Sequence, residues 1–411
     1  MSRTKRILTS VLSLILVASY VRPAYAEFRL SDAIEEFGER RFLKPLPTRI
    51  KVGPVRVHPL LESKVTYDSN ILLENRDARE DIVFNIKPGA IVELPFDKHQ
   101  VSAGYQADFE IFSKSRDAKQ NDQNQNFFAL FDFHFPNWYV NILEKLSETS
   151  SRSGTTFTER VPRIQQSINP KIGYRWKRTI FEGGFRHLVR DYRRQANDNL
   201  DFQVVEWTGV VFYDLFARLK AVLEYQFGQM DYDDNYKRNA NINQVRMGFE
   251  GELLPNVTAK VRTGMQFRDY EVSSEADYHS WIADVLFEYQ VRKNVKLEAF
   301  FTREPVEATF GNVNYYLEHA VGGGVEYLFR PQWLVFTTFK FKRQNYAERA
   351  TLGGQTQFRR DHPLSLDSGI RYDFRDWLSF ELAYQFLYRQ SNFDVFEYRD
   401  HQVSFGTTLA Y

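Results

Sequence analysis

The sequence has no cysteine in its 411 residues and almost no excess charge of either sign. Lack of cysteine excludes a disulfide framework and thiolate metal sites, and it suits a chain that crosses an oxidising periplasm without needing disulfides. The 54 basic and 53 acidic residues give a net charge of +1. No cluster of lysine and arginine stands out, so nucleic-acid binding is not indicated.

Long hydrophobic runs are also lacking. The apolar stretch from Ile7 to about Ala18 is too short and too interrupted to span a bilayer as a helix, and no other segment approaches that length. This stretch follows a basic start and precedes the small-residue pattern Ala24-Tyr25-Ala26. These features together predict a cleaved secretory signal over residues 1–26, with the mature chain starting at Glu27.

What the sequence does contain is alternation, most plainly at its end. Successive side chains of a strand point to opposite faces. In the last thirteen residues one face is largely apolar and the other is small and polar; the first comprises Val403, Phe405, Thr407, Leu409 and Tyr411. A closing strand that ends on an aromatic residue is typical of bacterial outer-membrane β-barrels. Phe405, Leu409 and Tyr411 are therefore the predicted signal to the barrel-assembly machinery.

The alternation can be followed from about Val55 to Tyr411. Eight short breaks rich in turn residues alternate with nine longer polar breaks, which include Thr149–Arg163 and Ala347–Gln357. Outer-membrane barrels have short periplasmic turns and long extracellular loops. The sequence thus predicts an all-β fold: a transmembrane, antiparallel, up-and-down barrel of about eighteen strands over residues 55–411. The aromatic content of 16% fits rings at both membrane interfaces.

Two segments alternate poorly, Tyr139–Ser147 and Val204–Phe212, so one hairpin is open to miscounting. Residues 27–54 do not alternate at all. Leu30, Ile34 and Phe37 stand at helical spacing, and two prolines follow. We expect a periplasmic leader with a short amphipathic helix, which either packs loosely on the barrel rim or acts as a plug or docking element.

Charged residues on the second face of the strands are costly in lipid, so they are predicted to face the lumen. A barrel this wide normally holds an aqueous interior. Both signs occur among the predicted lumen-facing residues, which are Arg175, Arg186, Lys260, Arg262, Arg268, Lys340, Lys342, Glu224, Glu288, Glu326 and Glu381. Cross-strand charge pairing explains this mixture better than a one-sided basic ring for polyanions, although the five residues from Lys260 to Lys342 are candidates for a local basic patch.

Several loops combine aromatic rings with carboxylates and amides, the groups that bind sugars. They are Tyr67–Asn70, Asp231–Tyr236 and Asn312–Tyr316. Two further rings, Phe112 and Tyr316, are predicted to line the lumen. The acidic run Asp231–Asp234 offers oxygen ligands for calcium. Solvated loops, or loops bridged to lipopolysaccharide by cations, remain the simpler interpretation.

Catalysis has only weak support. His187, His319 and His401 fall on the predicted outer face, where membrane phospholipases and acyltransferases place serine and histidine together, and Ser63 or Ser368 would be the serine. No pattern fixes a nucleophile, a base and an orienting group, and no nucleophile-elbow or zinc motif occurs. Interfacial histidines are the better interpretation, and no enzyme, cofactor or metal site is predicted.

Several segments, in order and spacing, resemble the putative β-barrel porin 2 family of outer-membrane proteins, and the resemblance covers most of Val55–Tyr411. They are Val57–Pro59, Val65–Ile71, Lys87–Gly89, Glu93–Phe96, Glu159–Arg163, Leu223–Tyr225, Asp231–Asp233 and Gly248–Leu253. The resemblance implies a pore in the outer membrane of a Gram-negative bacterium, in contact with lipid and lipopolysaccharide. It further implies export of a secreted polysaccharide, with a periplasmic polysaccharide-export protein as partner.

Two other functions stay open from the residues alone. A general diffusion porin for small hydrophilic solutes needs a loop that folds into the lumen, and Thr149–Arg163 is the candidate. A surface scaffold or adhesin would use the barrel only to display its loops.

Overall fold

A computed structural model describes residues 50–114, 122–150, 161–233, 236–272, 277–309, 313–352 and 354–411. The predicted signal peptide and residues 27–49 of the predicted leader lie outside these ranges. In the described part of the chain, no helix is both long and apolar enough to cross a membrane.

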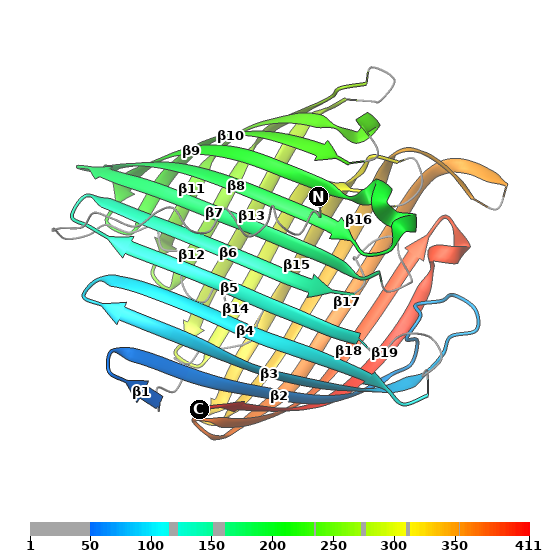
Figure 1. Ribbon diagram of the computed structural model, residues 1–411, viewed down its shortest axis with the longest axis horizontal. Coiled ribbons are helices and arrows are strands. Elements are labelled where there is room, and N and C mark those ends of the chain that lie inside the picture. The colour runs from blue at the N-terminus through cyan, green and yellow to red at the C-terminus, as the bar shows by residue number, and fades with distance from the viewer. Residues whose placement is uncertain are drawn as a thin grey trace, which may run out of the picture.

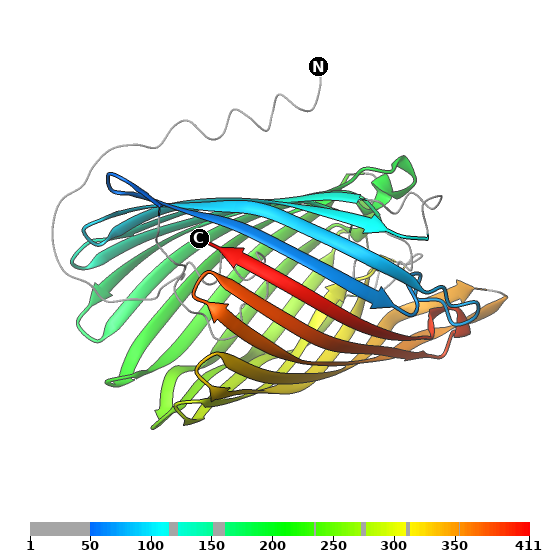
Figure 2. The same cartoon turned by 90° about the horizontal axis from the view of Figure 1, so that it is seen from below.

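Eighteen antiparallel strands, β2 to β19, form a closed barrel in which each strand pairs with its neighbours in sequence (Figure 1). The last strand closes the barrel by pairing with β2, and Figure 2 shows these two strands side by side. A short additional strand, β1, pairs only with the start of β2. The strand bounds are β1 Ile50–Val52, β2 Val55–Asp68, β3 Asp81–Phe96, β4 His99–Phe112, β5 Asp122–His134, β6 Trp138–Thr149, β7 Arg163–Trp176, β8 Thr179–Tyr192, β9 Phe202–Phe216, β10 Leu219–Tyr232, β11 Ala240–Leu254, β12 Val257–Tyr270, β13 Tyr278–Arg292, β14 Val295–Glu307, β15 Tyr315–Arg330, β16 Trp333–Leu352, β17 Gln355–Arg375, β18 Leu378–Ser391 and β19 Tyr398–Ala410.

The predicted strand number and the alternation of short and long connections are confirmed. Two or three residues connect the strands at the periplasmic rim, whereas the extracellular connections are mostly longer. Three of these contain short 3-10 helices, η2 (Gln195–Leu200), η3 (Tyr236–Arg238) and η4 (Asp394–Phe396). Most of the predicted loop Thr149–Arg163 lies outside the described residues.

One predicted loop, Ala347–Gln357, is wrong. β16 continues to Leu352 and β17 begins at Gln355, with a bulge where the register shifts between Asn345 and Arg349. These strand ends are polar because they extend past the lipid, where neither face has to be apolar. Polarity alone therefore does not end a strand beyond the membrane.

The two faces of the wall differ as the alternation predicts. On β10, Leu223 and Tyr225 are 54% and 51% exposed on the outer face, while Glu224 between them is buried toward the inside. The two poorly alternating segments form regular strands, β6 and β9. Their alternation is weak because their inward residues are apolar too, and Tyr139, Val210 and Phe212 pack in one buried cluster.

Two glycines allow β11 and β12 to approach each other closely. A Cβ atom at Gly264 would lie 1.8 Å from the carbonyl oxygen of Val245, and one at Gly248 would lie 1.7 Å from that of Val261. Both contacts are with backbone, which cannot rotate away as a side chain can. The register places Gly248 opposite Arg262, so this close approach positions the central charged residue of the barrel interior.

Candidate functional site: the barrel interior and its extracellular mouth

Five charged residues in the interior form what we call the central charge network: Lys171, Glu182, Glu224, Glu250 and Arg262. The guanidinium of Arg262 on β12 contacts the carboxylates of Glu224 on β10 and Glu250 on β11, the latter at 2.9 Å. Lys171 Nζ of β7 lies 3.8 Å from Glu182 of β8 and also interacts electrostatically with Glu224 and Arg262. Three carboxylates and two cations thus share one part of the wall.

Other predicted lumen-facing cations are also ion-paired. Arg175 Nη1 lies 2.8 Å from an oxygen of Asp214, and Arg186 Nε lies 2.7 Å from one of Glu206. Each pair joins strands that are adjacent or nearly adjacent in the wall, where such pairing holds both side chains against it. Lys342 Nζ contacts Glu318 at 2.8 Å in the same way, and Arg268 contacts Glu307.

The remaining predicted residues are three glutamates that each face a cation and two lysines that form no ion pair within the described ranges. Glu288 contacts Lys296, Glu326 lies opposite Lys296 in the register, and Glu381 lies opposite Arg371. Lys260 and Lys340 form no ion pair with any residue in the described ranges; Lys340 instead lies over the ring of Phe300 at 5.3 Å. The basic residues from Lys260 to Lys342 are therefore interrupted by carboxylates and do not form one continuous basic patch.

Removing the central cation should change ion selectivity. With Arg262→Gln, Glu224 and Glu250 lose their common partner, so we expect the pore to favour cations and the reversal potential in a KCl gradient to shift by several millivolts toward the potassium potential. Planar-bilayer recordings of the purified barrel measure this shift. The double variant Arg262→Gln/Glu250→Gln restores the charge balance, so its reversal potential should return toward that of the wild type. An unchanged potential in the single variant would place the network outside the ion path.

At the extracellular mouth, the wall is interrupted between β13 and β14. Their pairing ends at Ala283↔Arg303, although both strands continue. Residues Glu304–Glu307 of β14 stay paired with β15, as far as Glu307↔Tyr315. We call residues 304–317 the infolded hairpin, of which residues 310–312 lie outside the description.

Contacts of the infolded hairpin show that it lies against the inner face of the neighbouring strands. Tyr315 and Leu317 share the parity that faces lipid further down β15. Tyr315 nevertheless contacts the rings of Tyr270 and Tyr278, which lie on the inward parity of β12 and β13, and Leu317 packs against the same buried cluster. The outer face of the hairpin therefore covers the inner face of the neighbouring strands. The rings of Tyr270 and Tyr315 are stacked with their centroids 6.3 Å apart.

Two arginines hold the infolded hairpin to the wall. Arg268, 4% exposed, pairs with Glu307 and lies over the ring of Tyr315 at 5.8 Å. Arg238 at the end of η3 is also buried, and its guanidinium donates hydrogen bonds to the carbonyl oxygens of Ala308, Val313 and Asn314. Nothing in the sequence marks Arg238, because its partners are backbone atoms distant along the chain.

The other face of the hairpin is covered as well. Tyr316 packs with Tyr346, Phe393 and Phe396, the last two from the loop that contains η4. Arg359 is fully buried there, paired with Asp361 and placed 3.4 Å from the ring centroid of Phe396. Tyr316 is only 1% exposed, so the prediction that its ring lines the lumen is wrong.

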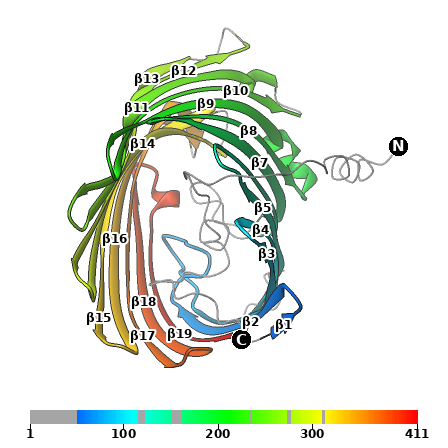
Figure 3. The same cartoon turned by 90° about the vertical axis from the view of Figure 1, so that its left-hand side faces the viewer.

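The loop between β2 and β3 also folds inward. Ile71 packs with Val83 and Phe112, so Phe112 is only 2% exposed and is a second predicted lumen ring that is instead covered. Asn75 Nδ2 donates a hydrogen bond at 2.9 Å to the carbonyl oxygen of Asp394, which links this loop to η4. Figure 3 shows the blue loop and the red η4 within the outline of the barrel. Inward-folded segments thus narrow the mouth.

One extracellular loop should respond to pH. Asp201, after η2, accepts a hydrogen bond from Tyr192 N at 2.7 Å, and burial raises the pKa of its carboxyl to about 6. Because this pKa lies above the ordinary 3.8, the protonated carboxyl of Asp201 stabilises the folded loop. This contribution is complete below about pH 4 and is lost as the pH rises through 6. We expect the protection factor of the Tyr192 amide to fall several-fold from pH 5 to pH 8. Hydrogen exchange measures it, and Asp201→Asn should remove the dependence; a flat profile in wild type would refute the assignment.

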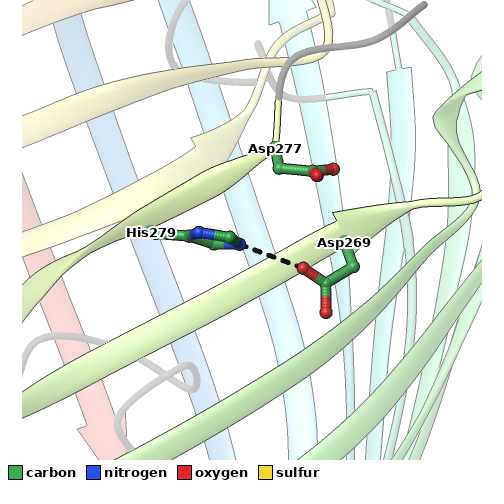
Figure 4. A group of neighbouring side chains, drawn as sticks. All are labelled: Asp269, Asp277 and His279. Atoms are coloured by element: carbon green, nitrogen blue, oxygen red, sulfur yellow. Dashed lines mark hydrogen bonds and ion pairs between the residues drawn. The ribbon is translucent and has the colours of Figure 1, made fainter. Parts of the chain in front are cut away.

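Three exposed groups meet at the extracellular end of the β12–β13 hairpin (Figure 4). His279 Nε2 lies 3.0 Å from Asp269 Oδ1, and Asp277 Oδ1 accepts a hydrogen bond from Tyr270 N at 3.0 Å. These bonds join β12 to β13 at the end of the hairpin. We therefore assign the three residues the structural role of closing it.

The imidazoles of two predicted outer-face histidines, His319 and His401, contact an arginine and a tyrosine. His319 Nε2 accepts a hydrogen bond from Arg303 Nε at 3.0 Å, and His401 Nδ1 lies 2.8 Å from the hydroxyl of Tyr384. Neither contact builds a nucleophile–base pair. In the last strand, Phe405 and Tyr411 are about half exposed on the outer face, while Leu409 lies opposite Leu61 of β2.

Known proteins resemble this chain in fold and in sequence. Three solved barrels are similar in fold. The outer membrane protein OpdK of Pseudomonas aeruginosa has 9% sequence identity, with 87% of this chain and 98% of that chain covered and a TM-score of 0.48. OccAB3 of Acinetobacter baumannii has 10% identity, coverage of 87% and 99% and a TM-score of 0.49, and the P. aeruginosa siderophore receptor PirA has 10% identity, coverage of 86% and 80% and a TM-score of 0.42. Characterised protein sequences give no match. The family model described as putative beta-barrel porin 2 matches residues 143–411, about two thirds of the sequence. The chain therefore belongs to this family and is a porin-like barrel of the outer membrane.

Proposed function

We propose that the barrel is the outer-membrane conduit through which a secreted polysaccharide leaves the cell, with a periplasmic polysaccharide-export protein as its partner. The observation that carries the proposal is the mutual neutralisation of the interior charges, seen in the Arg262–Glu224–Glu250 group and in the Arg175 and Arg186 pairs. Such a wall offers many hydrogen-bonding groups but little net field. A hydroxyl-rich polymer would bind it weakly and repeatedly, as conduction requires.

The infolded mouth fits a conduit whose opening is narrow when no polymer passes. Its segments are held by specific contacts, such as Arg268 with Glu307, and not by continuous strand pairing. Movement of the hairpin would widen the opening without breaking the barrel. The motive force would come from polymer synthesis behind it.

The first test is deletion of the gene, with complementation by the intact gene. Cell-surface polysaccharide and polymer held in the periplasm are both measured. Loss outside, with retention or arrest of synthesis inside, is the expected result. Unchanged surface polysaccharide would overturn the proposal.

A general diffusion porin for small solutes is the alternative, supported by membership of a porin family. It predicts steady single-channel conductance and uptake of small sugars by liposomes that contain the purified barrel. A scaffold or adhesin predicts no conductance, even after deletion of residues 27–54. These measurements separate the alternatives if the deletion strain has normal polysaccharide.

A further inference from the structure

The outer surface of the barrel is charged unevenly at its extracellular end. On one side, the outward-facing residues at the ends of successive up-strands are acidic; they are Glu148 of β6, Asp191 of β8, Asp231 of β10 and Asp269 of β12. On the other side, β14 to β17 carry basic residues at the corresponding places. We call four of these the basic outer patch: His319 of β15, Arg343 of β16, and Arg360 and His362 of β17.

The register makes these four residues neighbours on one face. His319 pairs directly with Arg343. The pairs Phe341↔Leu364 and Gln344↔Asp361 flank Arg343 and His362, which places them opposite each other. Arg360 lies two residues before His362 on the same face, opposite the uncharged Asn345. Residues two apart on a strand share a face, and cross-strand neighbours lie about 5 Å apart, so the patch is continuous.

The two arginines are exposed and lack acidic partners. Within the described ranges neither Arg343 nor Arg360 forms an ion pair; Arg343 Nε only reaches Asn345 Oδ1 at 3.4 Å. This contrasts with the interior, where most cations are paired. It also contrasts with the acidic side of the outer rim, where Glu148 is paired with Arg193 at 3.1 Å. The basic outer patch therefore keeps a net positive charge.

The height of the patch is set by the apolar belt beneath it. On β16 the outward residues Val335 and Phe339 are 39% and 44% exposed to lipid, and Phe341 comes next. Arg343 is the following outward position. The ring of Phe341 stacks on His362 with the centroids 6.3 Å apart, which joins the belt to the patch. The patch thus lies at the boundary between acyl chains and head groups of the outer leaflet.

We propose that the basic outer patch binds the phosphate groups of a phosphorylated glycolipid in the outer leaflet, as found in lipopolysaccharide. A guanidinium matches a phosphate with two parallel charge-assisted hydrogen bonds, and a cation just above an apolar belt meets the head group while the acyl chains cover the rings. Arg343 and Arg360 supply the charge, and the imidazole of His362 supplies a further polar contact; His319 packs beside Arg343, with its own Nε2 occupied by Arg303.

The test compares two variants of equal charge change. Arg343→Gln/Arg360→Gln removes the patch, whereas Arg330→Gln/Arg375→Gln removes two exposed arginines at the periplasmic rim, also on β15 and β17. Binding of bis-phosphorylated lipid A to the purified full-length barrel in detergent is measured by native mass spectrometry, with EDTA present so that divalent cations do not bridge. Heat-modifiable migration on gels verifies that each variant is folded.

We expect the patch variant to bind lipid A at least tenfold more weakly than wild type and the rim variant to bind normally. Lipid A without its phosphates should bind wild type as weakly as the patch variant binds the intact lipid. Equal loss in both variants would show a response to bulk charge and overturn the proposal. Unchanged binding in the patch variant, or equal binding of the two lipids by wild type, would also overturn it.

Discussion

Replacing Gly264 with valine is expected to reduce the yield of folded barrel to a small fraction of wild type. The new Cβ would lie 1.8 Å from Val245 O and 2.7 Å from the Cα of Arg246, both backbone atoms of β11. Relief requires β11 and β12 to separate, which breaks ladder hydrogen bonds beside the central charge network. Overpacking by side chains alone typically costs about 1–3 kcal/mol, so a backbone clash should cost about 3 kcal/mol or more. Folding into lipid vesicles, followed by heat-modifiable migration, measures the yield.

Gly209 of β9 provides the matched control. A Cβ at this position would meet no atom within 4 Å, and its backbone conformation is ordinary. Gly209→Val should therefore fold normally, and extra β-branching suits a strand. Equal yields of the two variants would mean that β11 and β12 do not approach as closely as the structure shows.

The second large effect is expected at the infolded hairpin. With Arg268→Met, the carboxylate of Glu307 loses its cation while it stays next to the buried Tyr232, whose hydroxyl lies 3.4 Å away. Breaking a buried pair by removal of one partner costs about 3–5 kcal/mol. We expect this cost to be avoided by release of the hairpin from β10–β13, so that single-channel conductance rises several-fold while the barrel stays closed. Planar-bilayer recording and urea unfolding in detergent measure the two consequences separately.

The double variant Arg268→Met/Glu307→Leu tests the cause. Replacement of both charges with apolar groups of similar size is often neutral or stabilising. The double variant should therefore hold the hairpin and conduct like wild type. If it conducts like the single variant, the arginine acts through its contact with Tyr315 and not through Glu307. If the single variant conducts like wild type, the hairpin does not control the mouth.

The sequence was sufficient to predict the barrel because lipid imposes a simple rule on its strands. Lipid-facing positions are mostly apolar and exclude charge within the bilayer, which gives the alternation from β2 to β19 and the strand count. The rule stops at the membrane boundary, which is why the strand ends at Ala347–Leu352 and Gln355–Gln357 were predicted as a loop. It also fails at Tyr315 and Tyr316, consecutive residues that are both buried because the infolded hairpin is covered on both faces.

The interior was harder to predict than the wall. Parity separates residues of the inner face from those of the outer face, so it identified charged residues such as Arg262 and Glu224. It does not give the register of one strand against its neighbours, so the partners Asp214 and Glu206 were not identified. The inward folding of the mouth left no pattern at all, since it depends on where the β13–β14 pairing ends.

Closure of the barrel between β19 and β2 has a consequence for how the chain is made. The hydrogen bond from Gln402 to Asp68 joins residues 334 apart, and nine pairs form this junction. Loop-closure entropy grows only logarithmically, so joining these ends costs about 2 kcal/mol more than closing a loop one tenth as long. Timing limits closure of the barrel more than entropy does, because the β2–β19 junction cannot form until the last residues have been synthesised. Until then β2 and the newest strand both expose unpaired edges, which are templates for aggregation. The chain therefore needs protection until its final strand arrives.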